Sequence, residues 1–169
     1  MVRVFLGLGS NEGSPLEQID EALRELPQRG VALVRASSRY RTEPVGGPPQ
    51  PWYVNAVAEV GFRGAPSELL WICRTIESHH GRRRVVENGP RTLDLDILLF
   101  SDLELESSEL AIPHPRFRDR RFVLVPMVEI APEVVDPVSG LTMRELLSRC
   151  ADESRVVPIS ESEPLSAGA

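Results

Sequence analysis

The chain has 169 residues, of which 41% are hydrophobic and 26% charged, the composition of one globular domain with its own core. Its formal net charge of −6 argues against general binding of nucleic acids, which normally requires a basic face. No apolar stretch approaches the length of a membrane span, and the N-terminal residues lack the cleavage site of a signal peptide, so we expect a cytoplasmic protein.

The first half of the chain alternates strand and helix patterns. In chain order these are a strand at 2–9, a turn at 10–13, a helix from Ser14 to Gly30, a strand at 31–41, a loop at 43–52 and a strand at 53–62. The helix starts with a capping box, Ser14-Pro15-Leu16-Glu17. The loop at 43–52 is rich in proline and glycine and is either a movable lid or an inert surface connection.

The second half continues the pattern. In chain order it has a helix from Ser67 to about Gly81, a basic loop at 81–90, a strand at 93–100, an extension at 103–106, an apolar segment at 122–130 that fits a strand end or a short helix, and a helix at 141–149. We expect a single domain at 1–150 and a poorly ordered tail at 151–169. This order of elements predicts an α+β fold, the ferredoxin-like split βαβ sandwich, in which helices pack on one face of an antiparallel sheet and the open face carries the site.

Two carboxylates interrupt the apolar strand at 93–100. The period of two places Asp94 and Asp96 on one face of this strand, ~6.6 Å apart. The other face then carries Leu93, Leu95, Ile97 and Leu99. Two unpaired like charges would be costly there, so we expect a cation between them. Two magnesium ions ~3.5–4 Å apart would fit such a pair of oxygen ligands.

The basic residues are unusual, since all 19 counted as Lys or Arg are arginines and the sequence contains no lysine. This excludes a P-loop lysine, a kinase-type strand lysine and Schiff-base chemistry. Eight arginines lie in two short stretches, 82–91 and 116–121, on either side of the aspartate pair. That arrangement indicates a polyphosphate bound with metal, although for any single arginine a solvated surface position is the commoner explanation. Cys73 and Cys150 lack metal-type spacing, so neither a disulfide framework nor a zinc site is expected.

An aromatic and an amide side chain share one face of the strand at 53–62. Tyr53 and Asn55 point the same way beside the loop at 43–52, where they could hold a flat heterocycle. On these residues alone, an ordinary tyrosine and asparagine on a sheet face is the preferred explanation.

Several motifs taken together resemble the 6-hydroxymethyl-7,8-dihydropterin pyrophosphokinases of folate biosynthesis. They are Gly7-Leu-Gly-Ser-Asn11, Tyr40-Arg-Thr-Glu-Pro44, Tyr53-Val-Asn-Ala56, Glu77 with Gly81-Arg82, Gly89-Pro-Arg-Thr-Leu-Asp-Leu-Asp96, and Pro113-His-Pro-Arg116 through Phe122. The resemblance runs from about Val4 to Leu147, and the string at 89–96 is its most specific part. It implies a ferredoxin-like fold and transfer of the β,γ-diphosphate of ATP to the hydroxymethyl group of the reduced pterin, with release of AMP.

The resemblance also implies roles for individual residues. Asp94 and Asp96 would hold two magnesium ions that bridge the ATP phosphates, while Arg82 and Arg91 would neutralise charge on the transferred group. Asn55 would hydrogen-bond the pterin. The other implied positions are Tyr53 and Phe122, which would sandwich the pterin ring, Thr42, Glu43 and Val45, whose backbone would read its polar edge, and Glu77, His114, Arg120 and Ile97, which would lie near the nucleotide. No role is carried over to 85–88, where the sequence departs from the family pattern.

The expected partners are therefore small molecules, with ATP as co-substrate, no nucleic acid, no membrane and a monomeric chain. Two other classes stay open. A magnesium-dependent nuclease or nucleotidyltransferase with an Asp-x-Asp strand would need a further carboxylate and a basic track. A non-catalytic ferredoxin-like regulatory module would have no use for an aspartate pair beside an arginine cluster. Formation of AMP from ATP only when a hydroxymethyl-dihydropterin is added separates the three.

Overall fold

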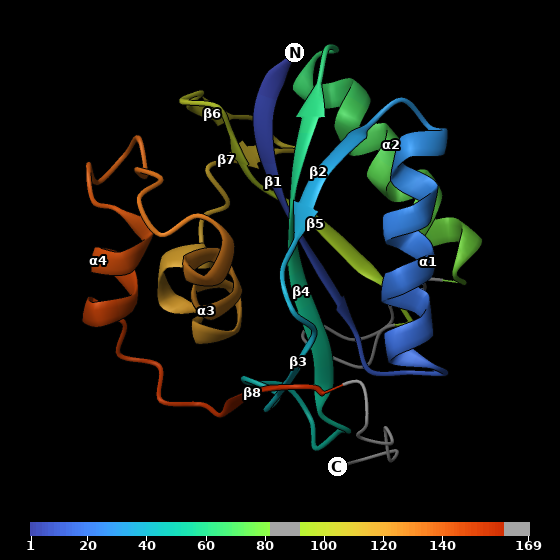
Figure 1. Ribbon diagram of the computed structural model, residues 1–169, viewed down its shortest axis with the longest axis vertical. Coiled ribbons are helices and arrows are strands. Elements are labelled where there is room, and N and C mark those ends of the chain that lie inside the picture. Colours follow the sequence, from blue (N-terminus) through green and yellow to red (C-terminus); the bar gives the residue numbers. More distant parts are fainter. Residues whose placement is uncertain (82–91, 161–169) are drawn as a thin grey trace.

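The computed structural model describes residues 1–81 and 92–160 of the chain. Within these residues, six strands form an antiparallel sheet that crosses the middle of the molecule (Figure 1). They are β1 (Val2–Ser10), β2 (Ala32–Ala36), β3 (Tyr40–Thr42), β4 (Tyr53–Phe62), β5 (Asp94–Phe100) and β8 (Val156–Pro158). The strand order is β5-β1-β4-β3-β8, and β2 pairs with β4 beyond the end of β3.

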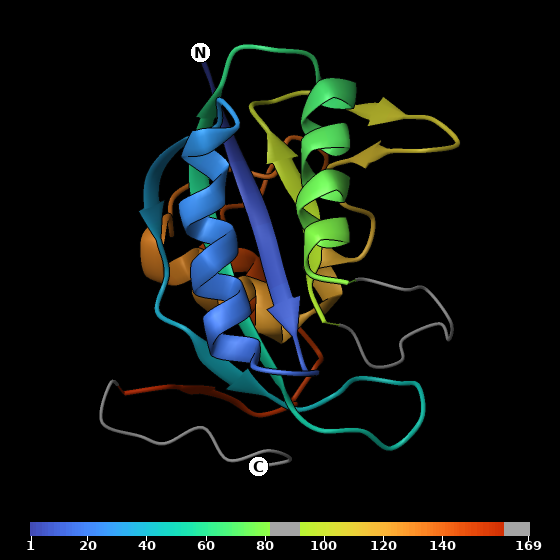
Figure 2. The same cartoon turned by 90° about the vertical axis from the view of Figure 1, so that its right-hand side faces the viewer.

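Helices cover both faces of the sheet (Figures 1 and 2). On one face lie α1 (Pro15–Gln28) and α2 (Pro66–His79), whose apolar side chains share a core with Leu6 and Leu8 of β1. On the other lie α3 (Arg121–Ile130) and α4 (Met143–Arg149), which pack around Phe5. The remaining elements are β6 (Leu105–Glu106), β7 (Ala111–Ile112) and the short helix η1 (Phe117–Asp119). Across the described ranges, every helix is too short or too polar to cross a membrane.

The predicted fold class is confirmed. The succession β1, α1, β2, β4, α2, β5 and the order of the strands in the sheet are those of a ferredoxin-like split βαβ sandwich. The helices α1 and α2 pack on one face, as expected. In addition, α3 and α4 cover part of the face that the sequence analysis left open, so the site has a wall as well as a floor.

At three places the structure corrects the sequence prediction or decides between its alternatives. The strand expected at 31–41 is divided into β2 and β3, because Ser37 leaves the ladder and its hydroxyl accepts a hydrogen bond from the Val57 N–H at 2.9 Å. The apolar segment at 122–130 is a helix. The capping box expected at Ser14 is not formed, since the Ser14 side chain caps no backbone N–H of α1.

The prediction for β5 is right for the aspartates and wrong for Leu99. Leu95 and Ile97 lie in the core with α1 and α2, and Asp94 and Asp96 lie on the opposite face. Leu99, however, packs with the α3 core, because a bulge shifts the pairing so that Phe5 faces Leu99 while Leu6 faces Ile97. The extra residue in the bulge reverses the alternation beyond it.

The segment 151–160 is not a loose tail as expected. Val156–Pro158 form β8, which pairs antiparallel with β3 and extends the sheet at that end. No alternating pattern marks this strand, because three residues are too few to show one. Residues 161–169 lie outside the described ranges.

The helix α3 is fixed to the sheet through one carboxylate. Glu129 accepts hydrogen bonds from the Tyr40 hydroxyl and from the Ser38 N–H and hydroxyl, the last at 2.9 Å. Burial and the neighbouring Glu129 charge raise the pKa of Tyr40, so this hydroxyl keeps its proton and acts as a donor. The C-terminal end of α3 is thereby held against β3 and the residues just before it.

Candidate active site

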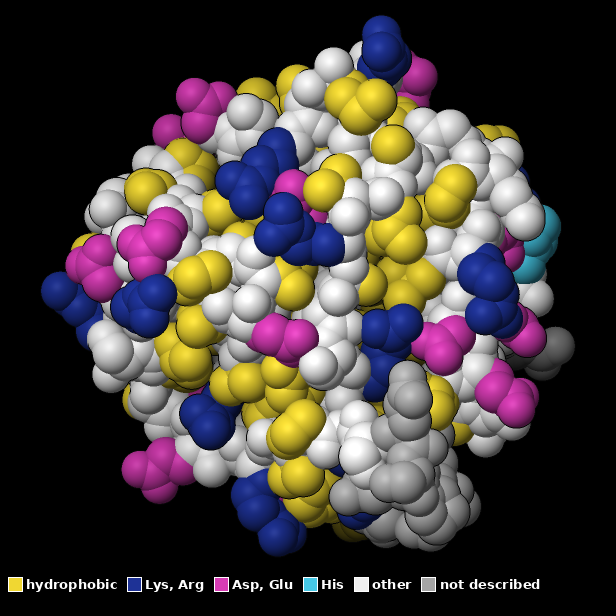
Figure 3. Space-filling model, in the orientation of Figure 1, with side chains coloured by type: hydrophobic (Ala, Val, Ile, Leu, Met, Phe, Trp, Pro, Cys, Tyr) yellow, Lys and Arg dark blue, Asp and Glu magenta, His cyan; other side chains and the backbone are white. Residues whose placement is uncertain are grey.

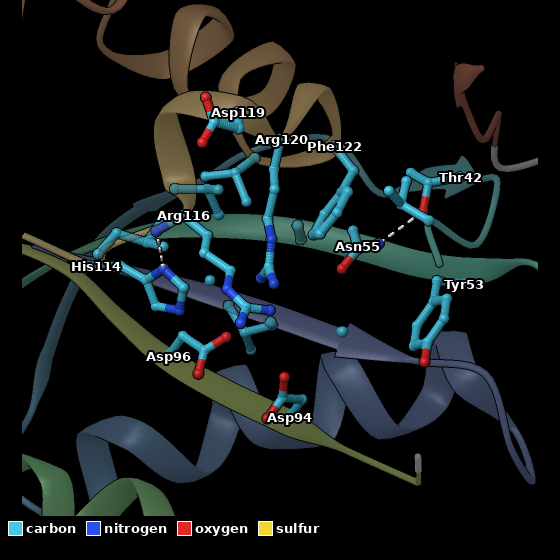
Figure 4. Close-up of a pocket in the computed structure, with 18 of the residues that line it drawn as sticks. Thr42, Tyr53, Asn55, Asp94, Asp96, His114, Arg116, Asp119, Arg120 and Phe122 are labelled. Atoms are coloured by element: carbon cyan, nitrogen blue, oxygen red, sulfur yellow. Dashed lines mark hydrogen bonds between the residues drawn. The ribbon is translucent and has the colours of Figure 1, made fainter. Parts of the chain in front are cut away.

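A cavity of ≈ 680 Å³ lies between the sheet and the segment leading into α3. Strands β1, β4 and β5 form its floor, the loop at 43–52 forms one rim, and residues 114–123 form the opposite wall (Figure 4). Side chains predicted for the site from distant parts of the sequence, including Asn55, Asp94 and Phe122, meet in this one space.

The middle of the floor is bare backbone. In the ladder, Gly9 of β1 pairs with Asn55 on one side and with Asp94 on the other, while Gly7 pairs with Asp96. A Cβ atom at Gly9 would lie 2.6 Å from the Asn55 Oδ1. Glycine is therefore required at position 9 for the amide to lie across the strand, and it leaves a groove between amide and carboxylate.

One end of the cavity carries the charged groups. Asp94 and Asp96 project side by side from β5 and are half-buried. Arg116 and Arg120 extend toward them from the opposite wall, so cationic and anionic side chains face each other (Figure 4). The predicted pairing of an arginine stretch with the aspartates is thus present for Arg116 and Arg120. Arg82 and Arg91 lie outside the described residues.

His114 sits beside the charged groups and is neutral at pH 7. The backbone N–H of His114 donates to the Leu98 carbonyl of β5 at 3.0 Å. The ring Nδ1 accepts a hydrogen bond from the backbone N–H of Arg116 at 3.1 Å. Burial, followed by the positive charges of Arg120 and Arg116, lowers the pKa of His114 to about 4, against the opposing effect of Asp94. Because Nδ1 is an acceptor, the ring proton is assigned to Nε2, which is then a donor.

The other end of the cavity is aromatic and neutral. The Asn55 Nδ2 donates to the Thr42 hydroxyl at 2.7 Å, and both side chains are buried, so the orientation of the amide is fixed. Tyr53 and Phe122 lie on either side of Asn55 (Figure 4). The Arg120 guanidinium is 5.5 Å from the centre of the Phe122 ring, which joins the aromatic end to the charged end.

The loop at 43–52 forms the rim over the aromatic end. Glu43, Val45 and Gln50 line the cavity, together with Thr42 at the end of β3. Asn11, at the end of β1, donates to the Gln50 side chain at 3.0 Å and to the Pro51 carbonyl at 2.9 Å. The loop therefore belongs to the site, and its movement as a lid stays a prediction.

Two predicted residues lie behind the cavity. Glu77, in the last turn of α2, is buried and accepts a hydrogen bond from the Leu95 N–H at 2.8 Å. Ile97 is buried on the same side of β5. Because β5 is an edge strand of the sheet, both residues lie close to its outer edge rather than among the residues of the aromatic end.

The sequence analysis assigned no role to Gly7, Gly9, Arg116 or Gln50, all of which line the cavity. A signal existed for the glycines, since Gly-x-Gly has the same period of two as Asp-x-Asp and Tyr-x-Asn. Only the ladder register shows that the three motifs share one face. For Arg116, the sequence showed the arginine-rich stretch at 116–121 but could not show which of its arginines face the cavity.

The donor set of the two aspartates fits magnesium. Hard oxygen ligands on one face, open to a cavity, suit an ion that keeps waters and substrate phosphates in its remaining positions. In the described part of the chain, no group of three or more His, Cys, Asp or Glu side chains is placed to hold a metal by itself. Such an ion would therefore need ligands from a bound substrate as well as from Asp94 and Asp96.

Comparison with known proteins gives a consistent result. The model of the 7,8-dihydro-6-hydroxymethylpterin-pyrophosphokinase family matches residues 5–132. The 2-amino-4-hydroxy-6-hydroxymethyldihydropteridine pyrophosphokinase of Synechocystis is 43% identical over 92% of this chain and 79% of its own length. The protein of the same name from Haemophilus influenzae is 40% identical, covering 92% and 98%.

Solved structures agree in fold. The Plasmodium falciparum HPPK-DHPS protein, solved with SDX-DHP, superimposes on 88% of this chain with a TM-score of 0.67 and 16% identity. This chain spans 43% of that longer one. At that identity the likeness supports the fold alone.

Proposed function

The chain belongs to the 7,8-dihydro-6-hydroxymethylpterin-pyrophosphokinase family, and we propose that the cavity over β1, β4 and β5 is its active site. The enzyme transfers the β,γ-diphosphate of ATP to the hydroxymethyl group of 6-hydroxymethyl-7,8-dihydropterin, giving the pterin diphosphate and AMP in folate biosynthesis. The observation that carries the assignment of the site is the register Asn55–Gly9–Asp94, which sets a fixed amide and a carboxylate on either side of bare backbone.

The pterin binds at the aromatic end. Its ring is held between Tyr53 and Phe122. The Asn55 carbonyl oxygen accepts a hydrogen bond from it, because the bond from Nδ2 to Thr42 fixes the amide with its oxygen toward Gly9 on the cavity floor. The backbone of Thr42, Glu43 and Val45 completes the polar contacts along the rim.

The triphosphate binds at the charged end. Asp94 and Asp96 would hold two magnesium ions, which would supply positive charge against the phosphate oxygens. Arg120 faces the same space, and Arg116 and the His114 Nε2–H add donors for phosphate oxygens. The family resemblance assigns to Arg82 and Arg91 the neutralisation of charge on the transferred diphosphate. Glu77 and Ile97, at the outer edge of β5, are the residues proposed for the nucleoside.

Geometry explains how these groups promote the reaction. Neighbouring strands lie ~4.8 Å apart, so the Asn55 and Asp94 positions are separated by roughly 10 Å across Gly9. The hydroxymethyl group lies over this gap, where its oxygen attacks the β-phosphorus. The bond from the β-phosphorus to the oxygen of the α-phosphate breaks, AMP leaves with that oxygen, and the proton of the hydroxymethyl group passes to water. Positioning and charge neutralisation dominate such transfers, so a strong general base is not required.

The division of the cavity is testable with two variants. Asp96→Ala should lower kcat by several powers of ten and change pterin affinity little, whereas Asn55→Ala should raise the pterin KM about tenfold or more and leave the ATP KM nearly unchanged. Both are measured from AMP formation, with and without the hydroxymethyl-dihydropterin. Equal loss of pterin binding in the two variants would contradict the assignment.

A nuclease or nucleotidyltransferase is not favoured. The family match supports the pyrophosphokinase, and on the face shown in Figure 3 arginines are interspersed with acidic side chains instead of forming a continuous basic track. We also propose that the chain acts as a monomer in the cytoplasm. The free thiols of Cys73 and Cys150 support the cytoplasm, and light scattering during gel filtration tests whether the chain is a monomer.

A further inference from the structure

The C-terminal strap, defined here as residues 152–158, runs past both sides of the aromatic end of the cavity. Its strand β8 pairs with β3, so that Val156 lies opposite Thr42 and Val157 opposite Arg41 (Figures 1 and 2). Thr42 is the residue that fixes the Asn55 amide. The strap is therefore bonded to the strand that leads directly into the loop at 43–52.

On one side the strap holds the start of α3. The Asp152 carboxylate accepts hydrogen bonds from the Arg121 N–H and the Ser154 N–H, each at 2.9 Å. The Arg121 guanidinium donates through Nε to the Ser154 carbonyl at 3.2 Å. Arg121 stands between Arg120 and Phe122, and both of these line the cavity. The strap thus fixes the backbone from which the Phe122 ring projects.

On the other side the strap holds both ends of the loop at 43–52. The backbone N–H of Arg155 donates to the Glu43 carboxylate at 2.5 Å, and the backbone N–H of Glu43 donates to the Arg155 carbonyl at 3.1 Å. The Nε of the Arg155 side chain lies 3.4 Å from the Glu43 carboxylate. The guanidinium carbon is 4.7 Å from the centre of the Trp52 ring. Glu43 and Trp52 are the first and last residues of the loop, so one arginine contacts its two ends.

We propose that the C-terminal strap sets the separation of the two walls that hold the pterin, with Arg155 as a positioning residue for the loop at 43–52. The inference rests on the proposed function, because it takes the aromatic end as the pterin site. The described contacts of Arg155 reach the loop at 43–52 and the end of β3, which are on the pterin side, and those of Asp152 reach the start of α3 beside Phe122. Strap variants should therefore affect pterin binding more than ATP binding.

Loop entropy explains why such a weak contact matters. The loop contains prolines and two glycines, Gly46 and Gly47, with φ of +73°, and a loop of this kind has alternative conformations when its ends are released. An apparent dissociation constant rises by the inverse of the fraction of molecules in the binding conformation. Arg155 is 71% exposed, so its ion pair contributes little to global stability. The consequence of losing it should appear in pterin affinity rather than in Tm.

The test compares Arg155→Ala with a matched control. Arg144→Ala removes another exposed arginine–glutamate pair, to Glu133 at 2.9 Å, on α4. We expect Arg155→Ala to raise the pterin KM and the calorimetric Kd for the pterin by about five- to tenfold, with the ATP KM and Tm close to those of Arg144→Ala. Arg155→Lys should recover part of this loss, since it keeps the charge near Glu43 but stacks less well on Trp52.

A second variant tests the α3 side. Asp152→Ala removes the acceptor of the Arg121 N–H and should also raise the pterin KM more than the ATP KM. If Arg155→Ala and Asp152→Ala change the pterin KM no more than Arg144→Ala does, or if they lower Tm and kcat with both KM values unchanged, the proposed role is wrong. If Asn55→Ala raises the pterin KM while the strap variants do not, the strap inference fails alone. If Asn55→Ala also has no effect, the site assignment itself fails.

Discussion

The Gly9→Ala substitution tests the central geometric feature of the site. The added Cβ would lie 2.6 Å from the Asn55 Oδ1, a separation too short for any relaxed contact, so the Asn55 amide has to rotate or move. The neighbouring Gly7 provides a control on the same face of β1, because a Cβ there would meet only the Leu98 side chain at 3.4 Å.

The expected magnitude follows from the contact that Asn55 would lose. Its Nδ2 donates to the Thr42 hydroxyl at 2.7 Å in a buried position, and leaving buried polar groups unpaired costs ~1–3 kcal/mol. Alanine recovers ~0.5–1 kcal/mol relative to glycine within a strand. The net loss of unfolding free energy is therefore roughly 0–2.5 kcal/mol for Gly9→Ala, whereas Gly7→Ala, which loses no hydrogen bond, should gain roughly 0.5–1 kcal/mol.

Catalysis should respond more selectively than stability. A misplaced Asn55 would lose the hydrogen bond to the pterin that we propose for it, so the pterin KM should rise by about tenfold in Gly9→Ala and by less than about twofold in Gly7→Ala. Urea unfolding and steady-state kinetics of AMP formation measure both effects. In the double variant with Asn55→Ala, the effect of Gly9→Ala on KM should largely disappear, because the clashing atom is absent. Equal KM values for the two glycine variants, or full additivity in the double variant, would refute the reasoning.

Further predictions concern stability and metal. Burial alone would raise the pKa of Asp136, but hydrogen bonds from Arg118 and Ser139 outweigh it and lower the pKa to about 2. The stabilisation is therefore complete above the unfolded pKa near 4 and is lost as pH falls toward 2, so the deficit of Asp136→Asn, about 2 kcal/mol at pH 7, should shrink over that window in urea unfolding. Thr142→Ala should cost ~1 kcal/mol in thermal unfolding, because its hydroxyl accepts the Glu145 N–H at the start of α4. Removal of divalent metal with EDTA should abolish AMP formation and leave calorimetric pterin binding within about twofold.

Each of these has a contradicting outcome. A deficit of Asp136→Asn that is constant from pH 7 to pH 2 would show that its charge is not what stabilises the fold. Unchanged thermal unfolding of Thr142→Ala would mean that the cap is replaced by water or by the Glu145 side chain. AMP formation that persists in EDTA, or pterin binding lost together with activity, would contradict the separation of the cavity into a metal end and a pterin end.

The alternation of apolar and polar residues was sufficient to predict most of the fold. The split of β4 into a face with Tyr53 and Asn55 and a face with Val54 and Ala56 was predictable, because burial of one face of a strand is enough to specify it. The same rule predicted that Asp94 and Asp96 lie on the face of β5 opposite the core. What the residues alone could not supply was a role for Tyr53 and Asn55, which the family resemblance strengthened and the shared cavity now supports.

Other features depended on contacts distant in sequence. The bulge that turns Leu99 to the α3 core arises from the pairing of β5 with β1, and nothing in the run of leucines marks it. The placement of α3 over β4 depends on Glu129 meeting Tyr40 and Ser38, and β8 is held by β3 rather than by its own composition. In each case tertiary contacts decide among local structures of similar energy.

The site and the core depend on the same ladder register. Because all strands share the period of two, Gly7 and Gly9, Asn55, and Asp94 and Asp96 form a grid on one face that no single motif contains. The opposite face of the same strands carries the apolar residues Leu6, Leu8, Val54, Ala56, Leu95 and Ile97. A slip of one residue in β5 would bury both carboxylates in that core and expose its leucines. The apolar face therefore fixes the spacing of the catalytic face, so variants that loosen the core around Leu95 should affect kcat through the position of the aspartates before they unfold the chain.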